Sequence, residues 1–498
     1  RLLAVCEARI GSSDDDAMKA FAVAVSDNGG ANWSKPMFLD AQAQKVTSLG
    51  VLLWDDETET VVLVYNRYTC GGPLANQTFA PPSNGTGCVN DASRHRTPIF
   101  SPFHMNEVML ISSGDYGRTW SEPRNISSGV LDRTDCFFFN TGPGNGIQLR
   151  NGSLMFSGSC LQECAHPCRG RTQSGWQNYV MSAAAVTSSD HGATWRRLPN
   201  APWHGAAAGH GGGFAENNIV ELGNGSLLIN SRINSWMDAT KTSDRGAQGT
   251  RMTTVSDTAG HSWHAPILRR DLPGAICQGP TISVLDNNHD SSRSRSRRRL
   301  FFSHPEGLYS MQDKVLPPGC ATDPHFVGWP TKGNFSGTCF EYPRGGDTIS
   351  SWPQWVGPFA RFAPCRTNIS IRVSEDDGES WPLFASEFWP GYPYVAGTRG
   401  VWTPGGPAPF PARAGYSALA FIPAPSASVA GHGDAGAAGV IALLFESTGQ
   451  AGPLRLICFD ATTAALLPAC RSPSRLKSDD QDAAPTLFVV SPGGDDSN

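Results

Sequence analysis

The octapeptide SGDYGRTW at Ser113–Trp120 recurs four more times along this chain of 498 residues. Close copies are SSDHGATW at Ser188–Trp195 and SEDDGESW at Ser374–Trp381. Looser copies are SDNGGANW at Ser26–Trp33 and SDTAGHSW at Ser256–Trp263. In the strict pattern S-x-D-x-G-x-T/S-W, the Asp can accept backbone N–H groups inside a turn, the Gly permits a positive φ, and the Thr or Ser can bond to the Asp. Each copy therefore predicts a tight turn whose Trp packs between neighbouring sheets.

The copies are flanked by short runs that alternate apolar and polar residues, which predicts a strand on either side of each turn. The last two copies start at Ser256 and Ser374, far enough apart to hold a further repeat that lacks the motif. Five marked turns and at least one unmarked unit predict an all-β fold, a six-bladed β-propeller of four-stranded antiparallel sheets. We expect the propeller to occupy residues 1–460, and a closing strand and a loose polar tail to occupy 461–498.

Composition supports this prediction and narrows the function. The chain has 54 Gly, 37 Pro and 14 Trp, a mixture that favours short strands and turns over long helices. A net charge of −5 argues against a general nucleic-acid-binding protein. The basic run RSRSRRR at Arg293–Arg299 is interpreted as a solvated hairpin insertion, with a targeting or polyanion-binding patch as the alternative. No apolar run is long enough to predict a membrane span.

The thirteen cysteines leave at least one unpaired within the chain if no second chain contributes. Clusters in Gly/Pro-rich stretches are typical of disulfides that staple loops; these are Cys70 and Cys88, then Cys160, Cys164 and Cys168, and Cys320 and Cys339. The spacing from Cys160 to Cys168 does not fit a standard zinc knuckle, so we predict no metal site. Cys6 and Cys458 lie in strand-like runs, which is typical of buried thiols.

Eight N-x-S/T sequons, together with the cysteines in loops, favour a location in the secretory pathway, in lysosomes or outside the cell. The sequons start at Asn32, Asn76, Asn84, Asn125, Asn151, Asn224, Asn334 and Asn368.

The octapeptide strongly resembles the Asp box of the sialidase (neuraminidase) family, with the bacterial and animal lysosomal members closest in character. The box does not by itself specify an enzyme, because it also occurs in propellers without glycosidase activity. In the family these turns lie on the rim, away from the active site. The function must therefore be sought in the residues between the copies.

Cleavage of a sialic acid sets particular demands on a site. The anomeric carbon already carries a carboxylate, which bidentate Arg residues hold best. A carboxylate nucleophile would be repelled by that charge, and sialidases use a Tyr instead. A neighbouring Glu can take the Tyr proton, and a separate acid must protonate the leaving oxygen. Neither a cofactor nor a metal is needed.

Two segments carry part of this set by resemblance. LLAVCEARIGSSDDD, residues 2–16, is similar to the family segment LLAFAEAR and the loop after it, which implies that Arg9 binds the substrate carboxylate and that Asp15 is the acid/base. Asp14 is the nearest alternative to Asp15, and Asp16 also stays open. The segment GFAENNIVELGNGSLLINSRIN, residues 213–234, implies that Glu216 activates the nucleophile and that Arg232 is a second carboxylate ligand. A hairpin with an NG turn would bring these two to one end.

Three more segments complete the set. CRTNISIRVSEDDGESW, residues 365–381, implies that Arg366 is the third carboxylate ligand, in preference to Arg372 nearer the Asp box. RAGYSALAFI, residues 413–422, implies that Tyr416 is the nucleophile, and ALLFES further on implies that Glu446 braces an Arg of the triad.

Two supporting segments resemble parts of the family that line the site. They are TGPGNGIQL at residues 141–149, and CQGPTISVL at residues 277–285, whose Gln278 we expect at the mouth of the site.

One departure affects the activity expected of this chain. The family's first triad Arg lies in an R-I-P segment before LLAFAEAR, whereas this chain begins at Arg1 and has no such segment. We interpret the chain as a fragment or processed form that is weakened by this loss, since a buried carboxylate contact contributes on the order of 2–5 kcal/mol.

The resemblance implies a retaining exo-α-sialidase that acts through a tyrosyl intermediate, with an acidic optimum, on sialylated glycoproteins, glycolipids or oligosaccharides. One alternative is a propeller that binds sialic acid without cleaving it. Another is a trans-sialidase, with Trp236 or Trp402 as an aromatic acceptor site. Linkage preference and oligomeric state are not predicted.

Overall fold

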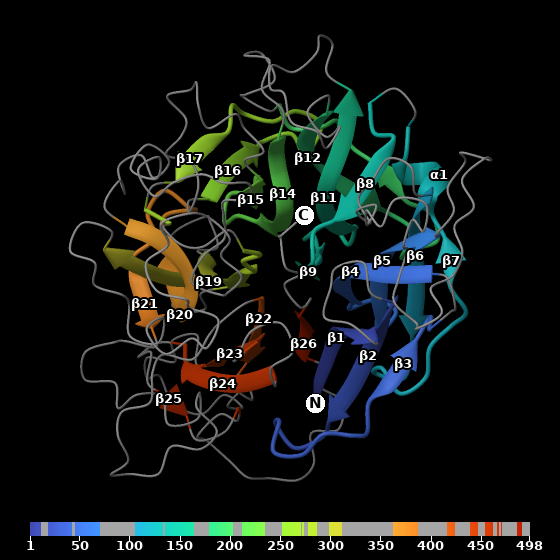
Figure 1. Ribbon diagram of the computed structural model, residues 1–498, viewed down its shortest axis with the longest axis horizontal. Coiled ribbons are helices and arrows are strands. Elements are labelled where there is room, and N and C mark those ends of the chain that lie inside the picture. The colour runs from blue at the N-terminus through green and yellow to red at the C-terminus, as the bar shows by residue number, and fades with distance from the viewer. Residues whose placement is uncertain are drawn as a thin grey trace, which may run out of the picture.

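The computed structural model describes an all-β molecule with one short helix, α1 (Ser127–Val130), among its described residues (Figure 1). The described residues are 1–10, 18–41, 45–69, 105–132, 135–163, 179–202, 212–234, 251–269, 271–272, 277–285, 298–310, 362–386, 416–423, 439–446, 454–461, 466–467, 470 and 486–490. The prediction of an all-β fold is confirmed within them.

Four sheets hold all 26 strands of the described part of the chain. The first follows the order β26-β1-β2-β4-β5-β6-β7, with β3 on β2 and β9 on β4. Its strands are β1 (Leu2–Ile10), β2 (Met18–Ser26), β3 (Met37–Leu39), β4 (Lys45–Asp55), β5 (Thr60–Thr69), β6 (Met105–Ser113), β7 (Arg124–Asn125), β9 (Gly144–Asn145) and β26 (Thr486–Val490).

The second sheet follows the order β10-β11-β12-β14-β15-β16-β17, with β13 on β12 and β8 on β11. Its strands are β8 (Phe138–Thr141), β10 (Ile147–Gln148), β11 (Leu154–Glu163), β12 (Tyr179–Ser188), β13 (Arg196–Arg197), β14 (Gly212–Glu221), β15 (Leu227–Asn234), β16 (Arg251–Ser256) and β17 (Ile267–Arg269).

The third and fourth sheets have four strands each, in chain order. They are β18 (Thr281–Leu285), β19 (Arg298–Ser310), β20 (Phe362–Ser374) and β21 (Leu383–Ser386), followed by β22 (Ser417–Pro423), β23 (Gly439–Glu446), β24 (Leu454–Asp460) and β25 (Leu466–Leu467).

The two nine-stranded sheets are each held together by a short parallel contact in the middle. β2 meets β4 at a single register pair, Lys19 with Val46, and β12 meets β14 at two pairs. The neighbours on either side of these contacts pair antiparallel over longer stretches. Hydrogen bonding therefore gives two sheets of nine strands, whereas the sequence predicted sheets of four strands throughout.

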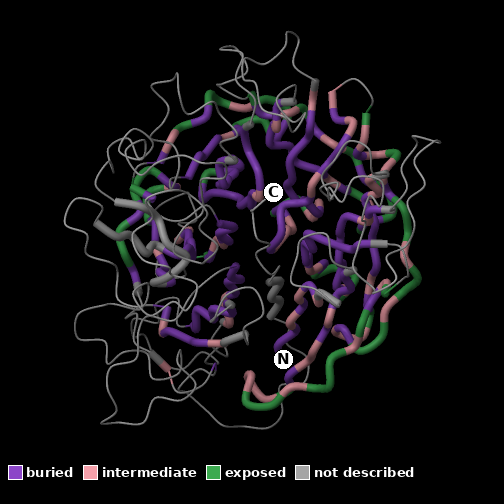
Figure 2. Tube along the Cα trace, in the orientation of Figure 1, coloured by how far each residue is buried: buried purple, intermediate pink, exposed green. Residues whose placement is uncertain are grey.

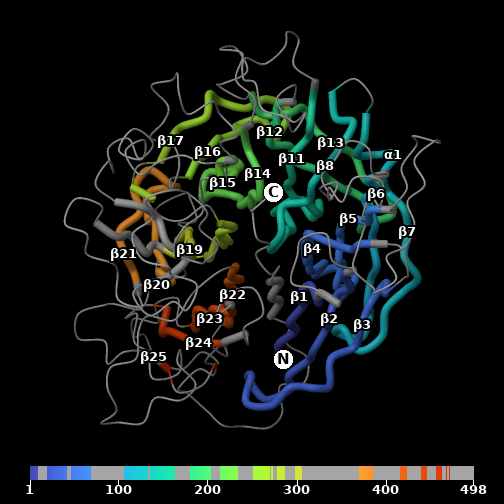
Figure 3. The backbone as a smooth tube through the Cα atoms, in the orientation of Figure 1, coloured from blue at the N-terminus to red at the C-terminus, as the bar shows by residue number. Residues whose placement is uncertain are grey.

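The strands lie around a common centre in chain order (Figures 1 and 3). The last strand, β26, returns to lie beside β1 (Figure 1). β26 pairs parallel to β1 over five residues, from Leu2 with Thr486 to Cys6 with Val490. Buried residues dominate the strands, while the exposed residues gather on the outer rim (Figure 2).

The Asp-box turns form the hydrogen bonds that their sequence predicts. In the copy at Ser113–Trp120, the Gly117 N–H donates to Ser113 Oγ at 2.8 Å, and Asp115 accepts the Thr119 N–H at 2.8 Å and the Thr119 hydroxyl at 2.6 Å. Gly117 has a φ of 87°. The copies at residues 188–195 and 374–381 repeat these bonds. In the looser copy at residues 256–263, Thr258 takes the place of the Asp.

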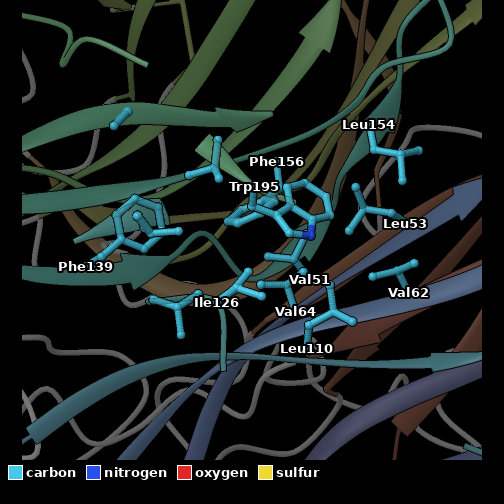
Figure 4. Close-up of a cluster of buried hydrophobic side chains, with 14 of the residues drawn as sticks. Val51, Leu53, Val62, Val64, Leu110, Ile126, Phe139, Leu154, Phe156 and Trp195 are labelled. Carbon is cyan, nitrogen blue, oxygen red and sulfur yellow. The ribbon is translucent and has the colours of Figure 1, made fainter. Parts of the chain in front are cut away.

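The Trp of an Asp box packs between sheets, as predicted. Trp195 lies in a cluster with Val51, Leu53 and Val64 of the first sheet and with Phe156 of the second (Figure 4). The rings of Trp195 and Phe156 are 5.2 Å apart between centroids. Burial of these side chains contributes roughly 1.5–3 kcal/mol each, which ties the two sheets together.

The described cysteines correct one prediction. Cys136 and Cys160 form a disulfide, and so do Cys458 and Cys470. The prediction of a buried thiol at Cys458 is therefore wrong. A strand-like context does not exclude a disulfide partner nearby in sequence, and here Cys470 follows the short strand β25. The other predicted loop cysteines lie outside the described residues: Cys70, Cys88, Cys164, Cys168, Cys320 and Cys339.

Two residues of the basic run are built into the fold. Arg298 and Arg299 begin β19 and are half-buried, whereas residues 293–297 lie outside the described part. The Arg299 guanidinium donates to the Ala461 carbonyl at 2.7 Å and contacts Glu375 at 3.3 Å. The interpretation of the run as solvated is wrong for these two residues. Among the described residues, no helix is long and apolar enough to cross a membrane.

Candidate active site

Glu216 and Arg232 face each other on the hairpin of β14 and β15. The strand register shifts between Phe214 and Asn217, so that two residues of β14 lie opposite the single residue Arg232 of β15. A bulge of this kind turns a side chain out of the regular alternation. Arg232 Nη1 donates to Glu216 Oε2 at 2.8 Å, and the Arg232 side chain is only 6% exposed.

Tyr416 joins this pair from a distant part of the chain. It directly precedes β22, is 4% exposed, and donates its hydroxyl hydrogen to Glu216 Oε1. Arg232 Nη1 also donates to the Tyr416 oxygen at 3.1 Å. One carboxylate can thus take the phenol proton, while one guanidinium stabilises negative charge on the phenol oxygen.

The other predicted site residues are described only in part or not at all. Arg9 lies in β1 opposite Lys19, Arg366 lies in β20 close to a register shift, and Glu446 ends β23 opposite Leu454. The side chains of Arg9, Arg366 and Glu446 lie outside the described residues, and so do Asp14, Asp15, Asp16, Trp236 and Trp402 altogether.

The alternative carboxylate ligand, Arg372, is described and has a different position. Its Nη1 donates to the Trp381 carbonyl at 2.9 Å, at the Asp-box end of β20. This contact engages Arg372 away from the start of the strand, where Arg366 lies.

Gln278 was expected at the mouth of the site, but it is 2% exposed. Its Nε2 donates to the Pro143 carbonyl at 3.1 Å, and its Oε1 accepts the Ser417 N–H at 3.2 Å. Gln278 therefore joins the Gly-Pro-Gly segment to the residue that follows Tyr416. The sequence carries no signal that separates a side-chain amide in a buried contact from one that lines a site.

The Gly-Pro-Gly segment packs closely against β14. A Cβ placed on Gly142 would lie 1.9 Å from the Asn217 carbonyl oxygen, a distance that no side chain allows. The Pro143 carbonyl accepts a second hydrogen bond, from Asn218 Nδ2 at 3.4 Å. The segment thus supports the strand that carries Glu216.

A buried arginine that sequence reasoning missed lies next to the cluster. Arg251 on β16 pairs in register with Arg232 and is 1% exposed. Its guanidinium donates to Asn230 Oδ1 at 3.0 Å and to the Cys277 carbonyl at 2.9 Å, and it lies over the Phe302 ring. Burial lowers the pKa of Arg251 to about 9, which the charge of Glu216 partly offsets. Arg251 begins a strand that is buried along nearly its whole length, and nothing in the local sequence marks this residue as buried.

A second buried polar group supports the start of the chain. Glu7 on β1 and Lys19 on β2 are almost fully buried, with Lys19 Nζ 3.4 Å from Glu7 Oε2. Glu7 Oε1 also accepts the Ser48 hydroxyl at 2.9 Å. This ion pair joins the two strands that flank the segment of Asp14, Asp15 and Asp16. Among the described residues, no group of His, Cys, Asp or Glu side chains could hold a metal ion.

Asp-box turns in an all-β fold, with a Tyr, Glu and Arg cluster, define a class of repeat-containing β proteins, and comparisons with known proteins identify the family. The BNR repeat-like domain family matches residues 1–400. The chain therefore belongs to this family, and the curated relatives reported below are sialidases.

A sialidase from Bacteroides fragilis (strain YCH46) is 26% identical over 223 residues, which cover 44% of this chain and 34% of that protein. A sialidase from Micromonospora viridifaciens is 30% identical over 225 residues, which cover 42% of this chain and 30% of that protein. The chain thus spans about a third of the length of these curated relatives.

A solved structure described as Hadza microbial sialidase Hz136 matches with a TM-score of 0.51 at 18% identity, over 93% of this chain and 66% of that one. At this identity the match shows a similar fold. It agrees with an all-β architecture for the chain.

Proposed function

We propose that the strands form a six-bladed β-propeller. Six runs of four strands succeed one another in the sheet order: β26-β1-β2-β3, β4-β5-β6-β7, β10-β11-β12-β13, β14-β15-β16-β17, β18-β19-β20-β21 and β22-β23-β24-β25. In this proposal the short parallel contacts within the nine-stranded sheets join neighbouring blades. β26 closes the ring by pairing with β1, so that the first blade combines strands from both ends of the chain.

We propose further that the protein is a retaining exo-α-sialidase that removes terminal sialic acid from glycoconjugates. The contact of Tyr416 with Glu216 and Arg232 carries this proposal, since it joins residues 200 and 184 positions apart in sequence. The sialidases among the relatives support the same substrate class. A buried Tyr that is bonded to both a base and a cation has the environment that a phenol nucleophile requires.

In the proposed reaction, Glu216 takes the phenol proton as the Tyr416 oxygen attacks the anomeric carbon. Arg232 stabilises the developing phenolate and also binds the substrate carboxylate, together with Arg9 and Arg366. An acid, Asp15 or its neighbour Asp14, protonates the leaving oxygen. The same residue then activates the water that hydrolyses the tyrosyl intermediate, which restores the original anomeric configuration.

The charge of the substrate explains the choice of nucleophile. The sialic acid carboxylate is attached to the carbon that is attacked, so an Asp or Glu nucleophile would bring a second negative charge against it. The phenol of Tyr416 is neutral until Glu216 takes its proton. The attacking phenol oxygen therefore approaches the substrate with less negative charge than a carboxylate nucleophile would carry. Arg232 offsets the charge that develops on this oxygen, because its Nη1 lies within hydrogen-bonding distance.

The test uses Tyr416→Phe, with Tyr65→Phe as a matched control. Tyr65 is also buried, and its hydroxyl donates to Asp40 at 2.8 Å in another part of the molecule. With a fluorogenic sialoside, we expect Tyr416→Phe to lower kcat by at least a thousandfold and Tyr65→Phe to leave it within a fewfold of wild type. Similar activity of the two variants would refute the assignment.

The covalent step has a direct assay of its own. A fluorinated sialic acid that slows the second step should leave its sugar on the peptide that contains Tyr416, detected by mass spectrometry. Binding of sialosides by the complete protein without hydrolysis would instead support the non-catalytic alternative.

A further inference from the structure

Two turns of the molecule share a sequence and a conformation. Asn151–Ser153 connects β10 to β11, and Asn224–Ser226 connects β14 to β15. In each turn the Asn side-chain oxygen accepts the backbone N–H of the Ser, at 3.0 Å in the first turn and 2.9 Å in the second. The central glycines have φ angles of 85° and 91°. The two turns are therefore nearly identical copies at the tips of two hairpins.

This conformation uses one end of the Asn amide and leaves the other available. Asn151 and Asn224 are both exposed. Within the described part of the chain, neither Nδ2 has a hydrogen-bond partner, because the turn engages only Oδ1. Both residues begin an N-G-S sequon, the acceptor sequence for N-linked glycans.

Asn125 provides an internal comparison. It is exposed and begins a sequon, and its Oδ1 accepts the Ser127 N–H at 2.9 Å in the same kind of turn. Its Nδ2, however, donates to Glu107 Oε1 at 3.0 Å, and Glu107 also pairs with Arg67 at 2.9 Å. A sugar on the Asn125 nitrogen would displace this bond to Glu107, whereas the amide nitrogens of Asn151 and Asn224 have no such bond to lose among the described residues.

The position of the twin turns relative to the candidate active site is also defined. Glu216 lies five residues before the end of β14, and Arg232 lies five residues after the start of β15, so the Asn224 turn is about 17 Å away along the strands. The turn contacts an Asp box, where the Gly223 N–H donates to Asp377 Oδ1 at 3.1 Å. A glycan on Asn224 would therefore project from the Asp-box end of the hairpin and leave the Tyr416 end open.

The Asn151 turn has a similar neighbour. A Cβ placed on Gly152 would lie 2.6 Å from Glu57 Oε1, and the His191 ring of another Asp box lies 3.6 Å from the same carboxylate group. Both turns thus lie beside Asp boxes, on the same end of their hairpins.

We propose that Asn151 and Asn224 carry N-linked oligosaccharides at the Asp-box end of the molecule. In the transfer step, Asn Nδ2 forms a bond to C1 of the sugar of a polyprenyl-diphosphate oligosaccharide. The bond from C1 to the diphosphate oxygen breaks, the amide nitrogen loses one proton, and the lipid diphosphate leaves. These glycans cover the end of the hairpins opposite the Glu216 and Arg232 cluster.

The experiment uses the full chain secreted from a eukaryotic host behind a cleavable leader. Peptide-N-glycosidase digestion in heavy-oxygen water converts each glycosylated Asn into labelled Asp, and mass spectrometry of the peptides identifies the sites. We expect labelled Asp at positions 151 and 224, and much lower labelling at Asn125. The variants Asn151→Asp and Asn224→Asp keep an oxygen that can accept the Ser N–H, and each should remove one glycan from the intact mass without altering the fold.

Unlabelled peptides at Asn151 and Asn224 in the secreted protein would overturn the proposal, and equal labelling at Asn125 would overturn the geometric selection on which it rests. Deglycosylation of the folded protein should leave the turnover of a fluorogenic sialoside within twofold of the glycosylated form, and a larger change would refute the assigned placement. The peptide labelling depends on no catalytic activity, so a failure of the proposed sialidase function would leave this result intact.

Discussion

Replacement of Gln278 by Met tests whether this buried amide positions the candidate nucleophile. Gln278 Oε1 accepts the N–H of Ser417, the residue directly after Tyr416, and Gln278 Nε2 donates to Pro143. Met has a similar volume and neither bonding atom. The variant leaves the Ser417 N–H buried without this partner, while the Pro143 carbonyl keeps its bond from Asn218.

The magnitude follows from these contacts. A buried N–H without a partner costs about 1–3 kcal/mol, and the lost donor to Pro143 adds on the order of 1 kcal/mol. We therefore expect Gln278→Met to lower the free energy of unfolding by about 2–4 kcal/mol, measured by urea denaturation. If Tyr416 also shifts relative to Glu216, kcat should fall by roughly tenfold to a hundredfold, since small misplacements of a reacting group are costly, whereas KM should change little.

Gln148 provides the matched control. Its amide donates to Asp55 at 3.0 Å and to the Gly152 carbonyl at 3.1 Å, at the Asp-box end of the molecule. Gln148→Met should also lower stability, but it should leave kcat unchanged. If both variants lose stability and both keep wild-type kcat, Gln278 has only a structural role, and the positioning argument is refuted. The stability measurement tests the hydrogen bonds even if the protein has no sialidase activity.

Three further predictions concern the framework. Hydrogen bonds led by the Thr194 hydroxyl lower the pKa of Asp190 to about 2, below its unfolded value of 3.8. This Asp box should therefore contribute stability above about pH 4, and that stability should be lost as the pH falls through about 2. Asp190→Asn should flatten the dependence of the unfolding midpoint on pH over that range. Gly142→Ala should lower the unfolding midpoint by 10 °C or more or prevent folding, because the added Cβ would meet a carbonyl oxygen of β14 at 1.9 Å. A soluble variant with an unchanged midpoint in calorimetry would contradict this close packing. The double variant Cys136→Ser, Cys160→Ser removes a disulfide that spans 24 residues, and its free energy of unfolding should fall by about 3 kcal/mol in denaturant titration. A fall below about 1 kcal/mol would show that this disulfide constrains the unfolded chain little.

The repeat was the most predictable part of the fold because its physics is local. The hydrogen bonds of an Asp box join residues no more than four positions apart, so the letters of Ser113–Trp120 are enough to specify the turn. The pairing of β26 with β1 depends on contacts between opposite ends of the chain, which no local pattern encodes. The sequence led us to expect a closing strand in the last residues, but not its parallel direction.

The candidate site likewise has a part that the local sequence predicts and a part that depends on distant contacts. Glu216 and Arg232 could be placed together because an NG turn joins two runs of suitable length. The register shift that sets their side chains face to face has no signature in the letters, since a bulge depends on the pairing of both strands. Arg251 is the clearest omission, because a buried arginine and an exposed one look alike in a strand, and only the carbonyls of a distant segment explain its burial.

The buried cations also suggest why the Tyr416 cluster lies where it does. Arg232 and Arg251 are register partners on neighbouring strands, and the carboxylate of Glu216 contacts Arg232 directly. Two adjacent buried guanidinium groups would repel each other unless an anion offset them, and the carbonyls around Arg251 do so only in part. A carboxylate substrate that approaches Arg232 would add an anion beside one carboxylate and two cations of the described residues, which are Glu216, Arg232 and Arg251. Removal of the Arg251 charge should therefore weaken the binding of anionic ligands even though Arg251 contacts carbonyl groups. The inhibition constant of a sialic acid analogue measured for Arg251→Gln, beside the unfolding midpoint of the same variant, separates this charge effect from simple loss of structure.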